Sequence, residues 1–134
     1  MRLRSGMTVI TFMLILLFLS TASAGDLKCA ECGMKVDMAS KFSARTAHGD
    51  TTLLFCDIGD LFTYLKKKNV QDARIEVKDY TDGSWIDARK TFYVHAEKKF
   101  NTPMGWGIAA FKNKDEAEKF GIAMDFYAAA KALK

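Results

Sequence analysis

The stretch FSARTAHGDTTLLFCDIGDLFTYLKKKN, residues 42–69, decides the expected fold. Two short runs, 42–46 and 51–55, carry loosely alternating or apolar side chains, and His48-Gly49-Asp50 between them supplies turn residues. Two such runs on either side of a turn are typical of a β-hairpin. The pattern therefore predicts a hairpin, with Cys56 at its exit.

A short helix is predicted to follow the hairpin directly. Asp57 or Gly59 can cap its start, the apolar residues that come next have helical spacing, and lysines fill the last turn, where positive charge suits the helix dipole. We expect this helix to end near Asn69.

The rest of the chain mixes strand and helix patterns. Period-two alternation or short apolar runs predict that the sheet continues through 74–80, 85–88, 91–95 and 106–111, and helical patterns occupy 115–120, after the capping residue Asn113, and 125–133. The expected fold class is α+β, a small single domain with a largely antiparallel sheet and short helices.

The amino terminus has the pattern of a secretory signal peptide. Arg2 and Arg4 form a positive region, residues 8–19 are apolar, and Ala22-Ser23-Ala24 is a small-residue cleavage site. The apolar run is shorter than the roughly 20 residues of a spanning helix, so an uncleaved anchor is the weaker alternative. We expect a leader over 1–24, cleavage after Ala24, a mature domain over 25–134 in the periplasm, and no stable membrane anchor.

Net charge and composition limit the kinds of binding partner that we expect. Loss of Arg2 and Arg4 with the leader lowers the net charge from +4 to +2, and the basic residues are scattered without a stacking pattern of aromatics. These features argue against nucleic acid as a binding partner.

Three cysteines cannot all pair within one chain, so at least one thiol is left over in an oxidising compartment.

Two cysteines and a methionine are concentrated in Cys29-Ala30-Glu31-Cys32-Gly33-Met34. Soft sulfur donors clustered in this way suit Cu(I), and a thioether is a poor ligand for Zn(II). The alternative is a disulfide between Cys29 and Cys32, with Met34 packed in a core.

A second thioether, Met104, lies in a loop between Pro103 and Gly105, where it could reach a metal site that Trp106 screens from water. The alternative is that Met104 is a partly buried loop residue and Trp106 a core aromatic. Met38 and Met124 have no such setting and are assigned to packing.

Cys56 could be a third sulfur ligand, and its place at a helix start predicts a depressed thiol pKa. A Cys-x-x-Cys-Gly pair followed by Phe-Cys also resembles metal-chelating modules of the YHS and TRASH type, in which His48 or His95 could complete a zinc site. The sequence contains no Ser/His/Asp set, paired catalytic carboxylates or phosphate loop, so we do not expect an enzyme.

The order of these motifs resembles the NosL family of accessory proteins of nitrous oxide reductase. The resemblance spans nearly all of the mature chain and rests on the Cys-x-x-Cys-Gly-Met motif, on 54–57, 85–88 and 92–94, and on 103–107, 109–111 and 117–121. It implies a periplasmic Cu(I) chaperone of α+β fold, built from ββαβ-type units, that delivers copper to nitrous oxide reductase. The family's copper-binding residues match Cys32, Met34 and Met104.

One departure concerns Cys29. Many family members are lipoproteins acylated on their first cysteine, whereas Cys29 follows charged and bulky residues and would be a free thiol. The hypothesis is therefore one Cu(I) bound by Cys32, Met34 and Met104, with Cys29, Cys56 or a histidine as an additional donor. The expected partners are a copper-receiving enzyme and a copper exporter or donor. A thiol-disulfide redox protein that uses Cys29 and Cys32, or a structural zinc module, are the alternatives.

Overall fold

The computed structural model describes residues 27–133. Within this range the elements are β1 (Ala44–His48), β2 (Thr51–Phe55), α1 (Ile58–Lys68), β3 (Arg74–Lys78), β4 (Trp85–Asp87), the 3₁₀ turn η1 (Ala88–Lys90), β5 (Phe92–His95), β6 (Ile108–Phe111), α2 (Lys114–Glu118) and α3 (Phe126–Ala132). The predicted α+β class with antiparallel pairing and short helices is confirmed.

The larger sheet has four antiparallel strands in the order β2-β1-β3-β4. The predicted hairpin forms its first pair, with His48 opposite Thr51 and Ala44 opposite Phe55. Gly49 adopts φ +56° in the two-residue turn, a conformation that suits a residue without a Cβ. The first strand begins at Ala44, two residues later than the pattern suggested, because the Phe42 side chain packs in an aromatic cluster outside this sheet.

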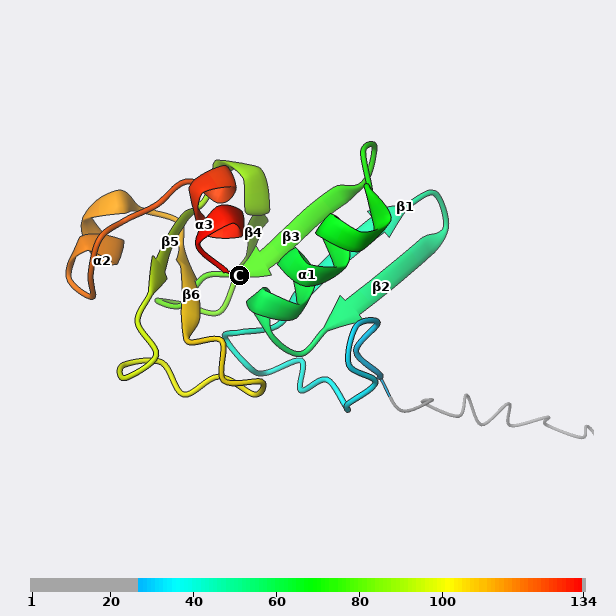
Figure 1. The fold of residues 1–134 in the computed structure, drawn as a ribbon, viewed down its shortest axis with the longest axis horizontal. Coiled ribbons are helices and arrows are strands. Elements are labelled where there is room, and N and C mark those ends of the chain that lie inside the picture. The colour runs from blue at the N-terminus through cyan, green and yellow to red at the C-terminus, as the bar shows by residue number, and fades with distance from the viewer. Residues whose placement is uncertain (1–26, 134) are drawn as a thin grey trace, which may run out of the picture.

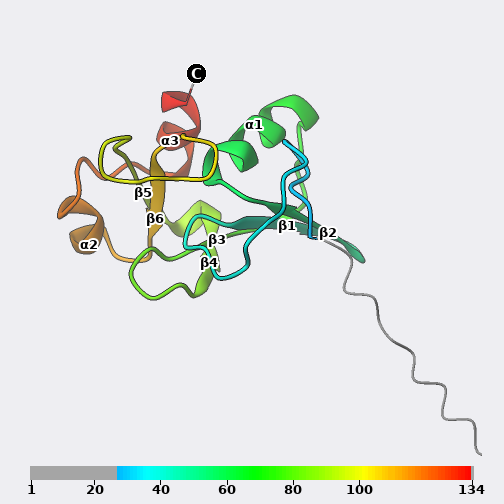
Figure 2. The ribbon, with the colours of Figure 1, turned by 90° about the horizontal axis from the view of Figure 1, so that it is seen from below.

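Helix α1 covers one face of this sheet, as the two perpendicular views show (Figures 1 and 2). Its predicted cap is confirmed, since the Asp57 carboxylate accepts a hydrogen bond from the Gly59 amide at 3.1 Å. The side chains on the inner side of the helix, those of Ile58, Leu61 and Phe62, are buried. The helix ends where Asn69 takes a left-handed conformation.

The strands predicted over 85–88 and 91–95 are present as β4 and β5, but the expectation that one sheet continues through both is wrong. Asp87 accepts a hydrogen bond from the Arg89 amide and starts η1, which turns the chain away from the larger sheet. Strand β5 then pairs with β6 in a separate antiparallel sheet. A single parallel bridge between Asp79 and Ala110 links the two sheets.

Two groups of buried side chains hold the fold. The larger lies between α1 and the four-stranded sheet and extends to β5, β6 and α3. The smaller lies around β6 and α2 and is rich in aromatic rings, with Tyr80, Phe100 and Phe111 in mutual contact. Met38 and Met124 pack against the larger group, as predicted.

The C-terminal helices differ from expectation in detail. Asn113 precedes α2, but its side chain makes no capping hydrogen bond, and the helix ends at Glu118. Asp125 does cap α3, by accepting a hydrogen bond from the Ala128 amide at 2.8 Å.

The predicted leader lies outside the described residues. Among residues 27–133, no helix is long and apolar enough to cross a membrane.

Candidate metal site

The junction between β2 and α1 places the first half of the site. Cys56 follows the last residue of β2, and Asp57 caps α1, so Asp60 lies in the first helical turn. Four residues of separation bring the two side chains to the same side of the helix start. The Cys56 thiol accordingly donates to Asp60 Oδ2 at 3.6 Å, and both residues are 3% exposed.

The loop of Cys29 and Cys32 supplies the second half. It is laid against β2, because the Ala30 amide donates to the Leu54 carbonyl at 2.8 Å. The loop closes through a hydrogen bond from the Gly33 amide to the Cys29 carbonyl at 2.9 Å. An ion pair between Glu31 and Lys67 ties it to the far end of α1.

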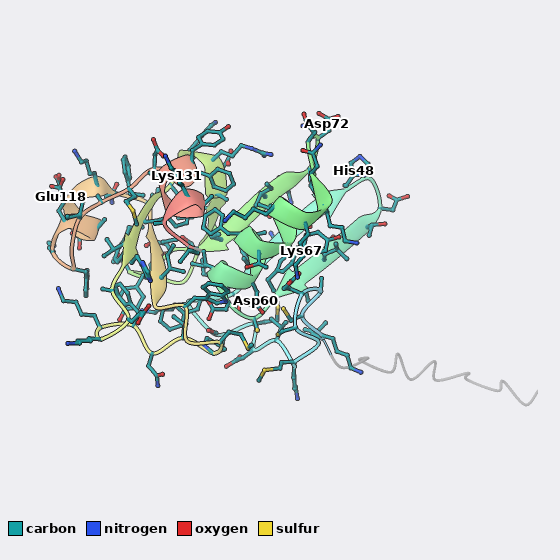
Figure 3. All side chains as sticks on the ribbon, viewed as in Figure 1. His48, Asp60, Lys67, Asp72, Glu118 and Lys131 are labelled. Atoms are coloured by element: carbon teal, nitrogen blue, oxygen red, sulfur yellow. The ribbon has the colours of Figure 1, made fainter. Side chains whose placement is uncertain are left out.

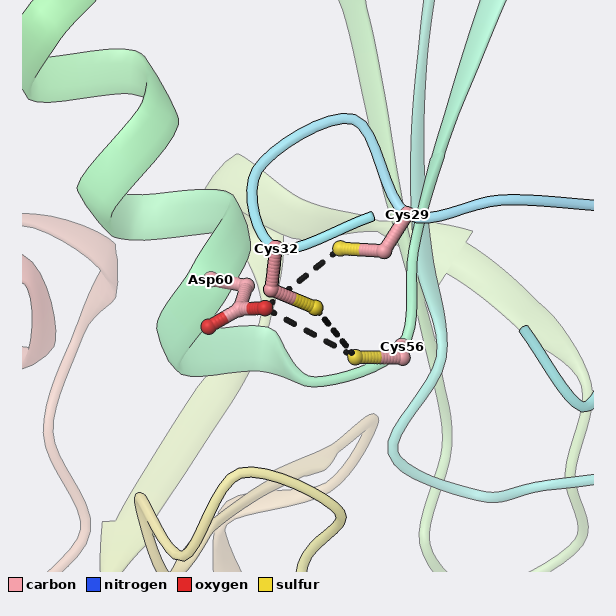
Figure 4. Close-up of side chains that lie close together, drawn as sticks. All are labelled: Cys29, Cys32, Cys56 and Asp60. Carbon is pink, nitrogen blue, oxygen red and sulfur yellow. Dashed lines mark hydrogen bonds between the residues drawn. The ribbon is translucent and has the colours of Figure 1, made fainter. Parts of the chain in front are cut away.

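Three thiols and one carboxylate meet beside the start of α1 (Figure 4), and Figure 3 labels the carboxylate residue, Asp60. The donor atoms of Cys29, Cys32, Cys56 and Asp60 all lie within 4.8 Å of one another. The sulfur atoms of Cys32 and Cys56 are 3.4 Å apart, and the Cys29 thiol donates to Asp60 Oδ2 at 3.4 Å. All three cysteines are free thiols, and Cys32 is the partly exposed one.

Burial controls the protonation of these thiols. It raises the pKa of Cys32 to about 11, against a smaller lowering by the Met34 amide. Burial also raises the pKa of Cys56, helped by its contact with Cys32. The predicted depression of the Cys56 pKa by the helix is therefore wrong, since desolvation of the thiolate outweighs the helix start. A soft cation that binds here would displace protons from these thiols.

A second loop, residues 101–107, is fastened to the same helix start by two carboxylates. Asp57 Oδ2 accepts from the Met104 amide at 2.9 Å, and Asp60 Oδ1 accepts from Trp106 Nε1 at 2.9 Å. The Trp106 ring lies directly on Gly59, where an added Cβ would be only 2.0 Å from the ring. Burial raises the pKa of Asp57, opposed by its hydrogen bonds. The indole therefore covers the helix turn that carries Asp60.

Three sulfur donors and a buried carboxylate form a set that can hold a metal. Thiolates suit Cu(I), and a tetrahedral set of thiolates and a carboxylate oxygen also suits Zn(II).

The family model NosL matches residues 21–125 of the chain. The chain belongs to the NosL family. A solved structure, the crystal structure of the copper chaperone NosL from Shewanella denitrificans, is 23% identical, covers 75% of this chain and 87% of its own, and superposes with a TM-score of 0.60. That likeness confirms the fold. A search of curated proteins found no match.

In this NosL-family chain the three predicted cysteines come together, while the two predicted methionines are connected to this part of the fold through their backbones. The Met34 carbonyl accepts from the Cys29 amide at 2.7 Å, and its side chain is 50% exposed. Met104 is held at the other edge through its amide, and its side chain is 41% exposed. Both methionines are thus accessible to solvent, while their backbones are bonded to Cys29 and to Asp57.

Neither histidine belongs to the donor cluster of this NosL-family chain. His48 ends β1 at the exposed hairpin turn, and His95 ends β5, where it lies 3.5 Å from Glu97. The sequence interpretation missed Asp60, because an acidic residue in a first helical turn is ordinary. Its spacing of four from Cys56 was the signal that could have revealed it.

Proposed function

We propose that this protein is a periplasmic Cu(I) metallochaperone that delivers copper to a copper enzyme, with nitrous oxide reductase as the recipient. Membership of the NosL family and the NosL relative described as a copper chaperone support this role. The observation that carries it is the convergence of three free thiols from two distant segments within 4.8 Å. The protein makes and breaks no bond of an organic substrate in this role.

The site divides into a buried and an accessible part. Cys29 and Cys56 are each 3% exposed and would anchor the ion, whereas Cys32 is partly open to solvent. Cu(I) is stable with two or three soft ligands, so an incoming sulfur or nitrogen donor can attack before a protein ligand leaves. Cys32 is the ligand that such an exchange would displace.

Met34 and Met104 are proposed as the thioether donors at the mouth of this site. Their side chains are exposed while their backbones are fixed by Cys29 and Asp57. A thioether binds Cu(I) more weakly than a thiolate does, so these residues suit arrival from a copper exporter or donor and departure to the recipient.

Anaerobic titration of the reduced protein with Cu(I), against a competing chelator, tests the proposal. We expect tight one-to-one binding that Cys32→Ser weakens at least tenfold and Met104→Leu weakens less. Met124→Leu is the matched control, since Met124 packs against the core and should leave the affinity unchanged. Unchanged affinity in both Cys32→Ser and Met104→Leu would remove the site assignment.

Parallel titration with Zn(II) tests the structural alternative. The carboxylate of Asp60 makes a Cys₃Asp zinc site chemically reasonable. Retention of Zn(II) in preference to Cu(I), together with loss of folding in chelator, would favour a structural zinc module.

The intact mass of the exported protein tests the predicted leader, since cleavage after Ala24 leaves Gly25 as the first residue.

A further inference from the structure

Two of the three thiols are already close to bonding distance. Cys32 Sγ and Cys56 Sγ lie 3.4 Å apart, although the residues are 24 positions apart in sequence (Figure 4). A disulfide has sulfur atoms about 2.05 Å apart, so formation of the bond requires the two atoms to approach by little more than an ångström. Cys32 is the sulfur with more room for this movement, because it is partly exposed whereas Cys56 is buried.

Cys29 is held differently. Its thiol donates to Asp60 Oδ2 at 3.4 Å, and its amide donates to the Met34 carbonyl at 2.7 Å. A bridge between Cys29 and Leu54 fixes its backbone to the neighbouring strand. The pairing that the Cys-x-x-Cys spacing suggests, Cys29 with Cys32, is therefore not the one that the sulfur contact favours.

Accessibility sets the order of events. Cys29 and Cys56 are each 3% exposed, so an oxidant in solution meets Cys32 first. A mixed disulfide on Cys32 would then lie next to the Cys56 sulfur. Thiol-disulfide exchange proceeds through such an intermediate, and an accessible thiol is the one that can attack the oxidant.

We propose that Cys32 and Cys56 form a reversible disulfide by exchange with a disulfide-bearing oxidant, and that this bond closes the metal site while Cys29 stays a thiol. In the first step, the Cys32 sulfur attacks the oxidant's disulfide and releases one of its thiols. In the second, the Cys56 sulfur attacks Cys32 Sγ and releases the other. Two electrons pass to the oxidant, and the two thiol protons end on the two released thiols.

The effect on metal binding rests on the proposed function. A Cys32–Cys56 disulfide removes two of the three thiolates. The Cys29 thiol, a carboxylate and the two proposed thioethers remain, and this set binds Cu(I) more weakly than one with three thiolates. The oxidised protein should therefore load copper poorly, and a thiol reductant should restore loading. The redox state of the pair would decide whether the chaperone can accept cargo.

Peptide mapping after redox equilibration tests the pairing without any metal. The purified protein is equilibrated with glutathione buffers of increasing oxidised share, free thiols are blocked with N-ethylmaleimide, and the protein is digested with trypsin and an endoproteinase that cleaves after Glu31. This separates Cys29 (29–31) from Cys32 (32–35) and from Cys56 (46–66). We expect 32–35 linked to 46–66, with Cys29 blocked.

Cys29→Ser is the matched control and should retain the cross-link, whereas Cys32→Ser should abolish it. A link between 29–31 and either of the other peptides, or no disulfide at any glutathione ratio, would overturn the pairing.

A second experiment tests whether the disulfide closes the metal site. Cu(I) is added anaerobically, as a chelator complex without reductant, to the oxidised and to the reduced protein. Equal binding by the oxidised and reduced forms would overturn closure, whereas no binding by the reduced form would refute the proposed function and leave the mapped pairing intact.

Discussion

Trp106 Nε1 donates a hydrogen bond of 2.9 Å to Asp60 Oδ1, while Asp60 Oδ2 accepts from the thiols of Cys29 and Cys56. One carboxylate thus connects the thiol cluster to a loop on the other side of the helix start. Because Met104 belongs to that loop, the position of an exposed thioether is linked through two side chains to the buried sulfur atoms.

Trp106→Phe should keep the ring on Gly59 and lose this hydrogen bond. We expect a decrease of about 1–3 kcal/mol in the free energy of unfolding, since the acceptor is a buried carboxylate that loses a partner. Urea denaturation measures it. Trp85→Phe is the control, because the partly exposed Trp85 ring has the cations of Arg45 and Lys78 over it, and a phenyl ring can also hold them. Equal losses in both variants would contradict the assigned role of the indole.

Gly59→Ala should destabilise the protein, although alanine normally stabilises a helix relative to glycine. The new Cβ would lie 2.0 Å from Trp106 Cγ, so the ring has to move, at a cost of about 1–3 kcal/mol. The same substitution in a Trp106→Ala background should be neutral or stabilising. A double-mutant cycle by urea denaturation measures the coupling between the two positions. Additive effects on the free energy of unfolding would show that the contact with Trp106 is not what makes alanine unfavourable at position 59.

Asp57→Ala should lower the free energy of unfolding by about 1–3 kcal/mol, because the variant loses a helix cap and the acceptor of the Met104 amide. Asp125→Ala is the matched control, since Asp125 is an exposed cap of the short helix α3 and should cost less. Asp57→Asn keeps an acceptor oxygen and should recover part of the loss. Thermal unfolding of the three variants provides the comparison.

Alkylation of Cys32 should be slow at neutral pH and should rise about tenfold per pH unit from pH 7 to 10, because the pKa of its thiol is raised to about 11. A raised folded-state pKa means that the thiol favours folding below its ordinary pKa, and this contribution is lost as the pH rises toward 11. The protein in guanidinium is the control, and its rate should level off near pH 9. A plateau below pH 9 in the folded protein would contradict the raised pKa.

Local patterns predicted the hairpin and helix α1 well, because both depend on neighbours in sequence. Gly49 supplies the turn and Asp57 the cap, and each acts within a few residues. The departure of β5 into a second sheet could not be predicted in this way. Its partner β6 comes more than ten residues later, and strand alternation carries no information about which partner is chosen.

The candidate site was predicted in its residue types more than in its arrangement. Clustering in sequence pointed to Cys29, Cys32 and Met34, but whether Cys56 would join them depended on how the first loop lies against β2. The direction of the Cys56 pKa shift was also wrong, because burial is a property of the whole fold. Assignment of Met34 and Met104 as ligands remains a prediction.

The ion pair of Glu31 with Lys67 and the bridge of Cys29 to Leu54 hold the first loop on the domain by contacts that are individually weak. Cargo bound by Cys29, Cys32 and Cys56 would join the same two segments far more strongly and close a loop of the chain. Loading would therefore also stabilise the packing of this segment on the domain. Each handover of the ion would remove that added stability, so an emptied carrier would unfold more readily than a full one.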